Sequence, residues 1–489
     1  MKNIFQIRIL IPLCITPLIL LILFLYSQPL NEEFSEDLAF DASRQNFKAF
    51  ITSSYYYPKS DSLGDNALAL VMTINQKGGQ DWQPNIIVHG RNATSGIVVE
   101  TEYAKITFQK FCNMTTIFAT VQLIPNTRKI SLISGNGKID IPFEVPPNVH
   151  HDVVVCISPL FISEQWQNFL FAVHIYKKFG AFMNLYLISA VDSFYHLMKE
   201  YEKENYLTVQ PWITPKFNGI SRNIVDPYNH IEFNNLVASQ SDCLLKYKET
   251  AKYITFFELD DVLIPNLAPT YFEEFERRFY LEKAALLFRA EDHGIKTIDD
   301  GDKYSFSKMF KTLSYQGTRE AERVVMMPKV ANHRGWVPGN LEKITVEDNT
   351  LVRLKDIHWV KEFPNGTTTP KYLNHPSFNL LENALIDEIE EDWNNMRNKS
   401  KVLNLLPQKE YYAKTTKKCY EKVLNDYIFN SNFTKTSCPG PQLCKYPKLE
   451  NVKCVHADAT YENVRDLQPI SYYFARNHRF STEMGCYPN

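Results

Sequence analysis

The sequence is poor in the glycine motifs that bind nucleotide phosphates. It has 17 glycines in 489 residues, and no Gly-x-Gly-x-x-Gly follows the first strand expected after residue 150, which disfavours a dinucleotide-binding fold. A Gly-Lys-Ser/Thr phosphate loop is also absent. The formal net charge is only −2, so there is no electrostatic case for a nucleic-acid partner. A hydrophobic content of 44% instead indicates a globular protein, with a length suited to roughly two to four domains.

Long apolar runs are scarce, and the one at residues 9–26 stands at the N-terminus. It is just long enough to span a bilayer. Lys2 and Arg8 precede it, so the positive-inside rule places residues 1–8 in the cytoplasm and the rest of the chain in the lumen. The alternative is a cleaved signal peptide, but no small-x-small cleavage site follows. We therefore expect a type II membrane anchor in the secretory pathway.

Paired Cys-x-x-Cys spacing is absent, which disfavours a zinc site. Eight cysteines follow the apolar run, five of them within residues 409–489. An even count in a lumenal chain predicts disulfides, although the sequence does not give their pairing. The same compartment is favoured by five glycosylation sequons, which we expect to be used; they stand at Asn92, Asn113, Asn365, Asn398 and Asn432.

The remaining chain divides into four regions. Residues 27–50 are polar and read as a short stem, and residues 51–148 are rich in short strand-like runs separated by turn signals. Their spacing predicts a small β-sandwich, either a carbohydrate-binding module or a structural spacer. Residues 150–408 are expected to form the catalytic domain, and 409–489 a cysteine-rich extension.

Strands and helices alternate in the third region. Apolar runs at 151–160, 183–189, 206–212 and 252–257 predict strands, and amphipathic segments at 164–179, 193–204 and 235–247 predict helices. Such alternation indicates a mostly parallel α/β sheet with flanking helices.

Three carboxylates follow the last of these strands: Glu258, Asp260 and Asp261. Ligands of open α/β sheets bind beyond the carboxyl ends of the strands. Glu258 and Asp260 alternate, so on an extended backbone they project to the same side. Paired carboxylates suit Mn²⁺ or Mg²⁺ bridged to substrate phosphates. The alternative to a metal site is that these carboxylates lie in a solvated loop at the end of the strand.

A series of blocks in this region resembles glycosyltransferase family 92, a family abundant in nematodes. The similarity covers about residues 150–400, and its blocks occur in the family's order. They are Val153–Phe161, Glu164–Gln167, Ile175–Ala181, Leu197–Glu202, Val209–Trp212, Ser241–Leu244, Ala251–Asp261, Val324–Val330, Gly335–Val337 and Leu354–Trp359. The resemblance implies a GT-A fold, a type II Golgi location and inverting transfer of a sugar. The implied donor is a UDP-sugar, with UDP-galactose and Mn²⁺ used by characterised relatives, and the acceptor is a glycan.

The resemblance also implies roles for single residues. Asp260 would be a metal ligand, and Glu258, where the family more usually has Asp, would bind metal or donor. Its extra methylene moves the carboxylate, which matters where geometry must be tight. Asp261 would orient the metal ligands and bind donor, or be a helix N-cap or loop residue. His358 would be a third metal ligand, or a core histidine. Asp242 would contact the nucleotide or brace the loop.

Two other functions compete with an active transferase. One is a non-catalytic, lectin-like or scaffolding relative with the same fold, which the Glu258 substitution favours. The other is a glycoside hydrolase, which also needs two carboxylates but no phosphate-bridging metal. An inverting transferase further needs a general base. The sequence does not choose among Glu291, Asp292, Asp299, Asp300, Asp302, Glu347 and Asp348.

Overall fold

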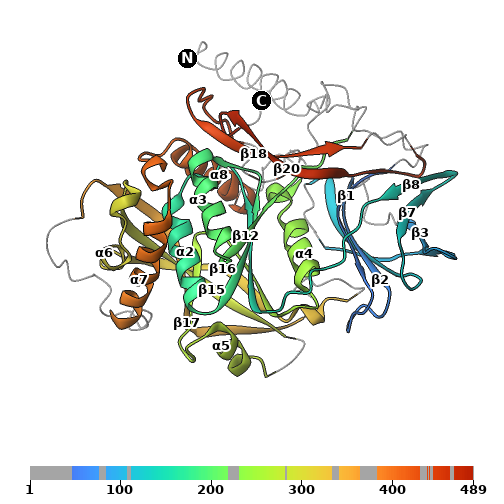
Figure 1. The fold of residues 1–489 in the computed structure, drawn as a ribbon, viewed down its shortest axis with the longest axis horizontal. Coiled ribbons are helices and arrows are strands. Elements are labelled where there is room, and N and C mark those ends of the chain that lie inside the picture. Colours follow the sequence, from blue (N-terminus) through green and yellow to red (C-terminus); the bar gives the residue numbers. More distant parts are fainter. Residues whose placement is uncertain are drawn as a thin grey trace, which may run out of the picture. The chain divides into compact units, whose positions relative to one another are not determined.

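The computed structural model describes most of the chain after residue 46. The described residues are 47–75, 84–106, 112–217, 231–280, 284–332, 341–363, 383–429, 438, 440, 444–462 and 467–487. They belong to one compact unit, and they form four β-sheets with flanking helices (Figure 1). The predicted anchor at residues 9–26 lies outside the described residues. Among the helices that are described, none combines the length and the apolar character that a membrane crossing requires.

The β-rich region is built from two sheets. One has the order β19-β1-β2-β6-β5 and the other the order β4-β3-β7-β8. The strands are β1 (Phe47–Tyr57), β2 (Ala67–Asn75), β3 (Ile87–Arg91), β4 (Gly96–Glu100), β5 (Glu102–Lys105), β6 (Met114–Gln122), β7 (Lys129–Ser134), β8 (Gly137–Ile141) and β19 (Ile470–Tyr473). Leu70 and Ile117 from the first sheet share a core with Val88 and Leu132 from the second, as a sandwich requires.

The first of these sheets contains a strand from near the C-terminus. β19 pairs in parallel with β1, with Phe47 opposite Ile470. A disulfide between Cys112 and Cys438 adds a second link between the β-rich region and the C-terminal region. The C-terminal region also supplies two strands, β18 (Lys453–Tyr461) and β20 (Ala475–Met484), to a three-stranded sheet with β11 (Ser189–Val191).

The largest sheet has eight strands in the order β12-β10-β9-β13-β16-β15-β17-β14. Its strands are β9 (His151–Leu160), β10 (Ala181–Leu187), β12 (Leu207–Pro211), β13 (Ala251–Phe257), β14 (Asp261–Ile264), β15 (Ala284–Ile298), β16 (Ser314–Met326) and β17 (Glu342–Val360). β12, β10, β9 and β13 are parallel, whereas β16 and β14 run against their neighbours. The prediction of an α/β sheet with flanking helices is therefore confirmed, but the sheet is mixed, with four parallel and three antiparallel strand pairs.

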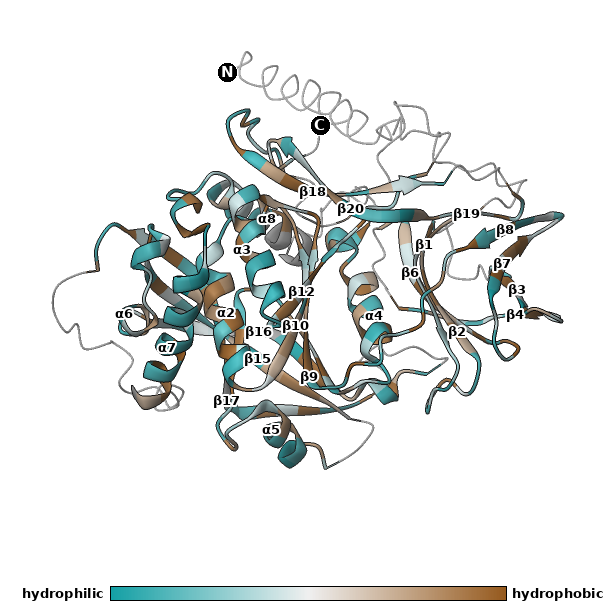
Figure 2. Cartoon of the chain, viewed as in Figure 1, coloured by the Kyte–Doolittle hydropathy of each residue, from teal (hydrophilic) through white to brown (hydrophobic). Residues whose placement is uncertain are grey.

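Helices cover both faces of this sheet. They are α2 (Trp166–Lys178), α3 (Asp192–Lys203), α4 (Leu236–Tyr247), α5 (Tyr271–Arg278), α6 (Phe306–Phe310), α7 (Asn383–Lys399) and α8 (Ala413–Phe429), with short 3-10 turns at Glu232–Asn235, Gly301–Lys303, Pro328–Val330 and Leu403–Leu405. Helix α2 is buried from Trp166 to Tyr176, and it carries more brown than the outer helix α7 in Figure 2. Gly180, at φ +81°, follows the end of α2, where a left-handed residue commonly terminates a helix.

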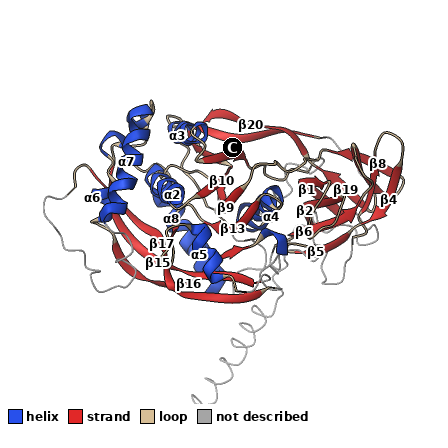
Figure 3. Ribbon diagram, turned by 60° about the horizontal axis from the view of Figure 1, so that its bottom comes forward, coloured by secondary structure: helices blue, strands red, loops and turns tan. Residues whose placement is uncertain are grey.

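Helix α4 lies between the large sheet and the β-rich region (Figure 3). Its residue Leu244 shares a core with Val154 and Ile254 of the large sheet and with Tyr57 and Val71 of β1 and β2. One apolar core therefore joins the two regions through this helix.

The predicted disulfides are present. Besides Cys112–Cys438, the bonds join Cys156 to Cys243, Cys419 to Cys444, and Cys454 to Cys486. All eight cysteines that follow the apolar run are thus paired.

Candidate functional site

The acidic motif lies in a tight turn between two strands of the large sheet. β13 ends at Phe257, residues 259 and 260 form the turn, and β14 begins at Asp261. The backbone N–H of Asp261 donates a hydrogen bond to the carbonyl of Glu258 across 3.1 Å. The prediction that Glu258 to Asp260 is extended is wrong. The chain turns there because β14 does not continue β13. β14 pairs with β17 at one edge of the sheet, whereas β13 is a central strand.

Asp261 is fully buried. The guanidinium Nε of Arg323 donates to its Oδ2, and the Tyr176 hydroxyl donates to its backbone carbonyl across 2.7 Å. Burial raises the pKa of Asp261, and the positive charge of Arg323 opposes that rise. Asp261 is therefore neither a helix N-cap nor a solvated loop residue. Its buried ion pair fixes the base of the turn.

Asp260 lies above this pair and is half-buried. Arg353 Nε donates to Asp260 Oδ2 across 3.2 Å, and the Leu354 N–H donates to the Asp260 carbonyl across 2.9 Å. Asp260 lines a cavity of about 430 Å³, which we call the donor cavity after the sugar donor that the resemblance leads us to expect there. Its volume is within the range of roughly 300–1,000 Å³ found for small-molecule sites.

Glu258 is not among the residues that line the donor cavity. Burial raises the pKa of its carboxyl group; Asp261 and Asp260 add to the rise, and Arg323 opposes it. The three acidic side chains are therefore close enough to influence one another, although Asp260 alone of the three lines the cavity.

Charged side chains of both signs line the donor cavity. It is lined by the segment after β9, by β17 and by the start of α8. The lining residues are cationic at Arg353, Lys355, Lys414 and Lys417 and acidic at Glu164, Asp260, Asp356, Glu410 and Glu421. Each of the four cations is paired with a carboxylate, and the pair with Lys417 lowers the pKa of Asp356. Arginine and lysine are the usual side-chain partners of phosphate groups, so a diphosphate could exchange with these carboxylates.

His358 also lines the donor cavity, with an exposed side chain on β17. It shares that cavity with Asp260. No three His, Cys, Asp or Glu side chains in the described ranges are placed to hold a metal ion together. Mg²⁺ in phosphate sites commonly uses one or two carboxylates, with phosphates and water completing its shell. The half-buried Asp260 carboxylate, which opens on the cavity, fits that kind of site.

Asp242 lies elsewhere. It is on α4 and lines a different cavity, which contains none of the residues of the donor cavity. Its carboxylate accepts a hydrogen bond from the Tyr55 hydroxyl across 3.0 Å and another from Tyr186. The structure does not bring Asp242 together with Asp260, Glu258 or Asp261.

The sequence did not reveal Arg323 and Arg353, which hold the acidic turn. They stand on β16 and β17, and an isolated arginine in a strand carries no local signal of its ion-pair partner. None of the seven carboxylates considered as general base lines the donor cavity. Of those seven, Asp292 comes close to it, since Lys355 Nζ lies 3.3 Å from its carboxylate.

Three of the five predicted glycosylation sites are described. Asn113 and Asn398 are exposed. The Asn92 side chain donates to the carbonyl of Pro125 across 3.0 Å and accepts from the Thr94 N–H across 2.9 Å. Asn365 and Asn432 lie outside the described residues.

Comparison with known proteins gives one consistent family. A model described as glycosyltransferase family 92 matches residues 151–405. Glycosyltransferase family 92 protein C33H5.2 of Caenorhabditis elegans is 43% identical over 459 residues, covering 90% of both chains. From the same organism, protein F13G3.3 is 32% identical over 479 residues, covering 93% of this chain and 92% of its own. Protein ZK381.2 is 31% identical over 455 residues, covering 90% and 89%.

Proposed function

Because this chain belongs to glycosyltransferase family 92, we propose that it is a metal-dependent, inverting hexosyltransferase that moves galactose from UDP-galactose to a glycan. Family membership supports the transferase activity. The observation that carries the proposal is the donor cavity, which Asp260 of the acidic motif lines together with Arg353 and three lysines. Arginine and lysine are the usual side-chain partners of phosphate groups, so they support a diphosphate donor.

The donor is held by the residues around Asp260. We assign the diphosphate oxygens to Arg353, Lys355 and Lys417, which line the cavity and would exchange their present carboxylate partners for the phosphates. Asp260 and His358 would hold Mn²⁺ or Mg²⁺, which stabilises negative charge on the leaving UDP. Buried beneath them, the Asp261–Arg323 pair keeps the turn, and hence Asp260, in place.

Transfer proceeds by a single displacement. The acceptor hydroxyl oxygen forms a bond to the anomeric carbon of the donor sugar, and the bond from that carbon to UDP breaks with its electron pair. A carboxylate takes the hydroxyl proton, and the anomeric centre inverts. Candidates lining the cavity are Asp356, Glu410 and Glu421. Glu164 also lines it, but its carboxylate accepts three backbone N–H groups at the start of α8, so it is committed to that helix.

We place the reaction in the lumen of the secretory pathway, in the Golgi. The apolar run at residues 9–26 would be its membrane anchor, with residues 1–8 in the cytoplasm. Four disulfides within the described residues support an oxidising compartment. The exposed sequons at Asn113 and Asn398 are compatible with glycosylation there.

A second candidate is a non-catalytic, glycan-binding relative. One observation favours it: Arg353 already neutralises the one motif carboxylate that faces the cavity. Glu258 in place of the family's usual Asp points the same way.

The test is a transfer assay with the full-length protein in detergent. UDP release and product mass are measured with UDP-galactose, a set of glycan acceptors and Mn²⁺. The proposal predicts turnover that EDTA abolishes and that Asp260→Asn reduces at least about a hundredfold, the scale of removing one electrostatic contact in a transition state. No turnover by folded protein supports the non-catalytic candidate. Sugar release that survives EDTA would indicate a glycoside hydrolase.

A further inference from the structure

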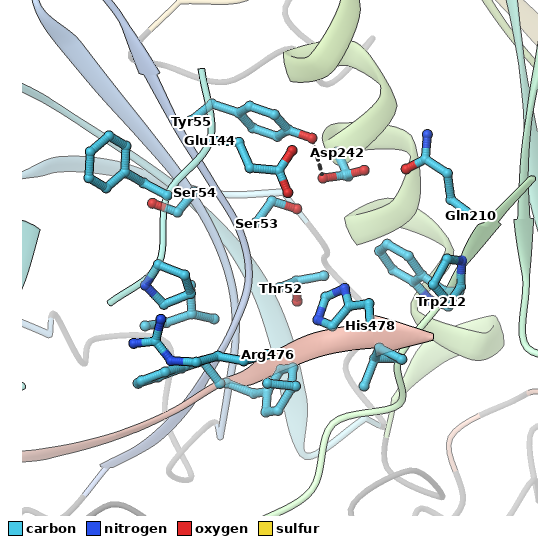
Figure 4. A pocket seen from close by; sticks show the side chains of 18 of the residues that line it. Thr52, Ser53, Ser54, Tyr55, Glu144, Gln210, Trp212, Asp242, Arg476 and His478 are labelled. Carbon is cyan, nitrogen blue, oxygen red and sulfur yellow. Dashed lines mark hydrogen bonds between the residues drawn. The ribbon is translucent and has the colours of Figure 1, made fainter. Parts of the chain in front are cut away.

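A second cavity lies where β1, α4, β12 and β20 meet, and we call it the junction cavity. Figure 4 shows it, with side chains converging from segments far apart in the sequence. Its volume is about 420 Å³, again in the range of roughly 300–1,000 Å³ for small-molecule sites. It shares no lining residue with the donor cavity. Nothing in the transfer mechanism uses it.

One wall of the junction cavity is a β-bulge. In the pairing of β1 with β2, Ile51 stands opposite Met72 and Ser53 opposite Val71, so Thr52 is an extra residue. Bulges redirect side chains and are over-represented beside active sites. Through this one, the consecutive residues 52, 53 and 54 all line the cavity.

The hydroxyl groups of these three residues are unpartnered. Thr52 Oγ1, Ser53 Oγ and Ser54 Oγ are buried and have no hydrogen-bond partner among the residues that the structure describes. Ser53 and Ser54 are only 7% and 8% exposed. A buried hydroxyl without a hydrogen-bond partner is unfavourable, because it has lost its water and gained nothing in return. Three such groups in one wall indicate a ligand that both donates and accepts hydrogen bonds.

Two carboxylates face the same space. Asp242 Oδ1 accepts from Tyr55 across 3.0 Å, and each oxygen of a carboxylate has capacity for a further donor. The Glu144 backbone is fixed against β1 by hydrogen bonds of 2.8 and 2.9 Å, and its side chain lies beside Asp242 (Figure 4). The positive charge of Arg476 is paired with Glu462 at 2.9 Å. The cavity is therefore acidic, which disfavours a phosphate ligand and favours one rich in hydroxyl donors.

Aromatic rings also line the cavity. Trp212 packs on Tyr186 with ring centroids 4.9 Å apart, and its indole N–H is occupied by the Asn234 carbonyl across 3.0 Å. Phe143 and Phe474 lie among the lining residues as well. A sugar ring presents hydroxyl groups at its edge and C–H groups on its face, so it can satisfy hydroxyls, carboxylates and aromatic surface together.

We propose that the junction cavity binds a neutral saccharide at a site separate from the donor cavity. The proposal goes beyond the transferase function and holds whether or not the chain transfers sugar. The Cys156–Cys243 disulfide supports a preformed site, since it ties α4 to β9 at the residue next to Asp242. The β-rich region is then part of a glycan-binding surface and not only a spacer.

Saturation-transfer NMR on the full-length protein tests this proposal. The probes are lactose and N,N′-diacetylchitobiose, in a detergent without a sugar headgroup. We expect at least one probe to bind, Glu144→Gln to weaken that binding about tenfold, as the loss of a hydrogen bond to a charged group does, and Asp260→Asn to leave it unchanged. The matched control is Glu100→Gln, an exposed glutamate on β4, which should also bind like the wild type.

Two results would overturn it. One is that neither disaccharide binds the folded wild-type protein. The other is that binding survives Glu144→Gln but is lost with Asp260→Asn, which would assign the sugar to the donor cavity. If Glu144→Gln does not fold, the same binding measurement is made on Ser53→Ala, which removes one unpartnered hydroxyl and keeps the bulge. We expect weaker binding by this variant, and unchanged affinity would contradict the proposal.

Discussion

Replacing Arg323 by glutamine should destabilise the protein through a single buried charge. Asp261 has a fully buried side chain, whereas that of Arg323 is 20% exposed. Removing the arginine leaves the carboxylate without its counter-ion, in a place where its Oδ1 already has no partner among the described residues. Breaking a buried ion pair from one side costs about 3–5 kcal/mol.

This loss is measurable as a shift in melting temperature. At about 2.1 cal/mol/K per residue, the roughly 370 described residues give an unfolding entropy of about 0.8 kcal/mol/K, so the first thermal transition should fall by about 4–6 °C. Arg353→Gln is the matched control. The side chain of its partner, Asp260, is 27% exposed, so water can replace the lost contact. The melting temperature of this variant should therefore fall by about 1 °C or less.

The destabilisation should also depend on pH. The pKa of Asp261 is raised above its ordinary value of 3.8 by burial. A raised carboxyl pKa favours folding below the unfolded pKa, and that contribution is lost as pH rises through the folded pKa. Arg323 opposes the rise, so without it the pKa rises further and more stability is lost toward neutral pH. The gap between wild type and Arg323→Gln should therefore widen from about pH 5 to pH 8.

Equal melting temperatures for wild type and Arg323→Gln would refute this reasoning. So would a gap that stays constant or narrows as the pH rises, because then Asp261 would not be the group left uncompensated.

Three further perturbations follow from the fold. Replacing Cys156 and Cys243 together by alanine opens a link across 87 residues and should cost about 2–4 kcal/mol, seen as a lower melting temperature under non-reducing conditions. Glu164→Ala removes the acceptor for three N–H groups at the start of α8; we expect a loss of about 0.5–2 kcal/mol in denaturant unfolding, with Glu164→Gln retaining part of it. Gly135→Ala puts a methyl group against the Gln468 carbonyl, on a residue whose φ is +53°. The substitution should lower the free energy of unfolding by about 1–3 kcal/mol and speed proteolysis of the β19 segment.

The sequence predicted the first part of the large sheet closely. Hydrophobic periodicity predicted seven elements nearly at their observed bounds: β9, α2, β10, α3, β12, α4 and β13. Each of them follows a strand or helix repeat of apolar residues within its own segment, so no distant contact was needed to recognise it. The sequence also placed three carboxylates after β13. It wrongly predicted an extended backbone from Glu258 to Asp260. The chain turns at Leu259 and Asp260 because β14 pairs with β17, nearly ninety residues later in the chain.

Features set by distant pairing were beyond the sequence. The arginine partners of Asp260 and Asp261 come from β16 and β17, and no local pattern matches an arginine to an aspartate so far away in the chain. The insertion of β19 beside β1 joins residues more than 400 positions apart. The junction cavity also forms between segments far apart in the sequence, namely β1, α4, β12 and β20. Asp242, expected to contact the nucleotide or brace the loop, therefore lines a space separate from the donor cavity.

Calorimetric titration of UDP into the full-length protein tests the central claim, that Asp260 and the neighbouring arginine and lysines form a metal-dependent donor site. It is done with Mn²⁺ and with EDTA, for wild type and Asp260→Asn. We predict binding by the wild type with Mn²⁺, and none with EDTA or in the variant. Failure of the folded wild type to bind UDP, or equal binding by Asp260→Asn in Mn²⁺, would contradict the account.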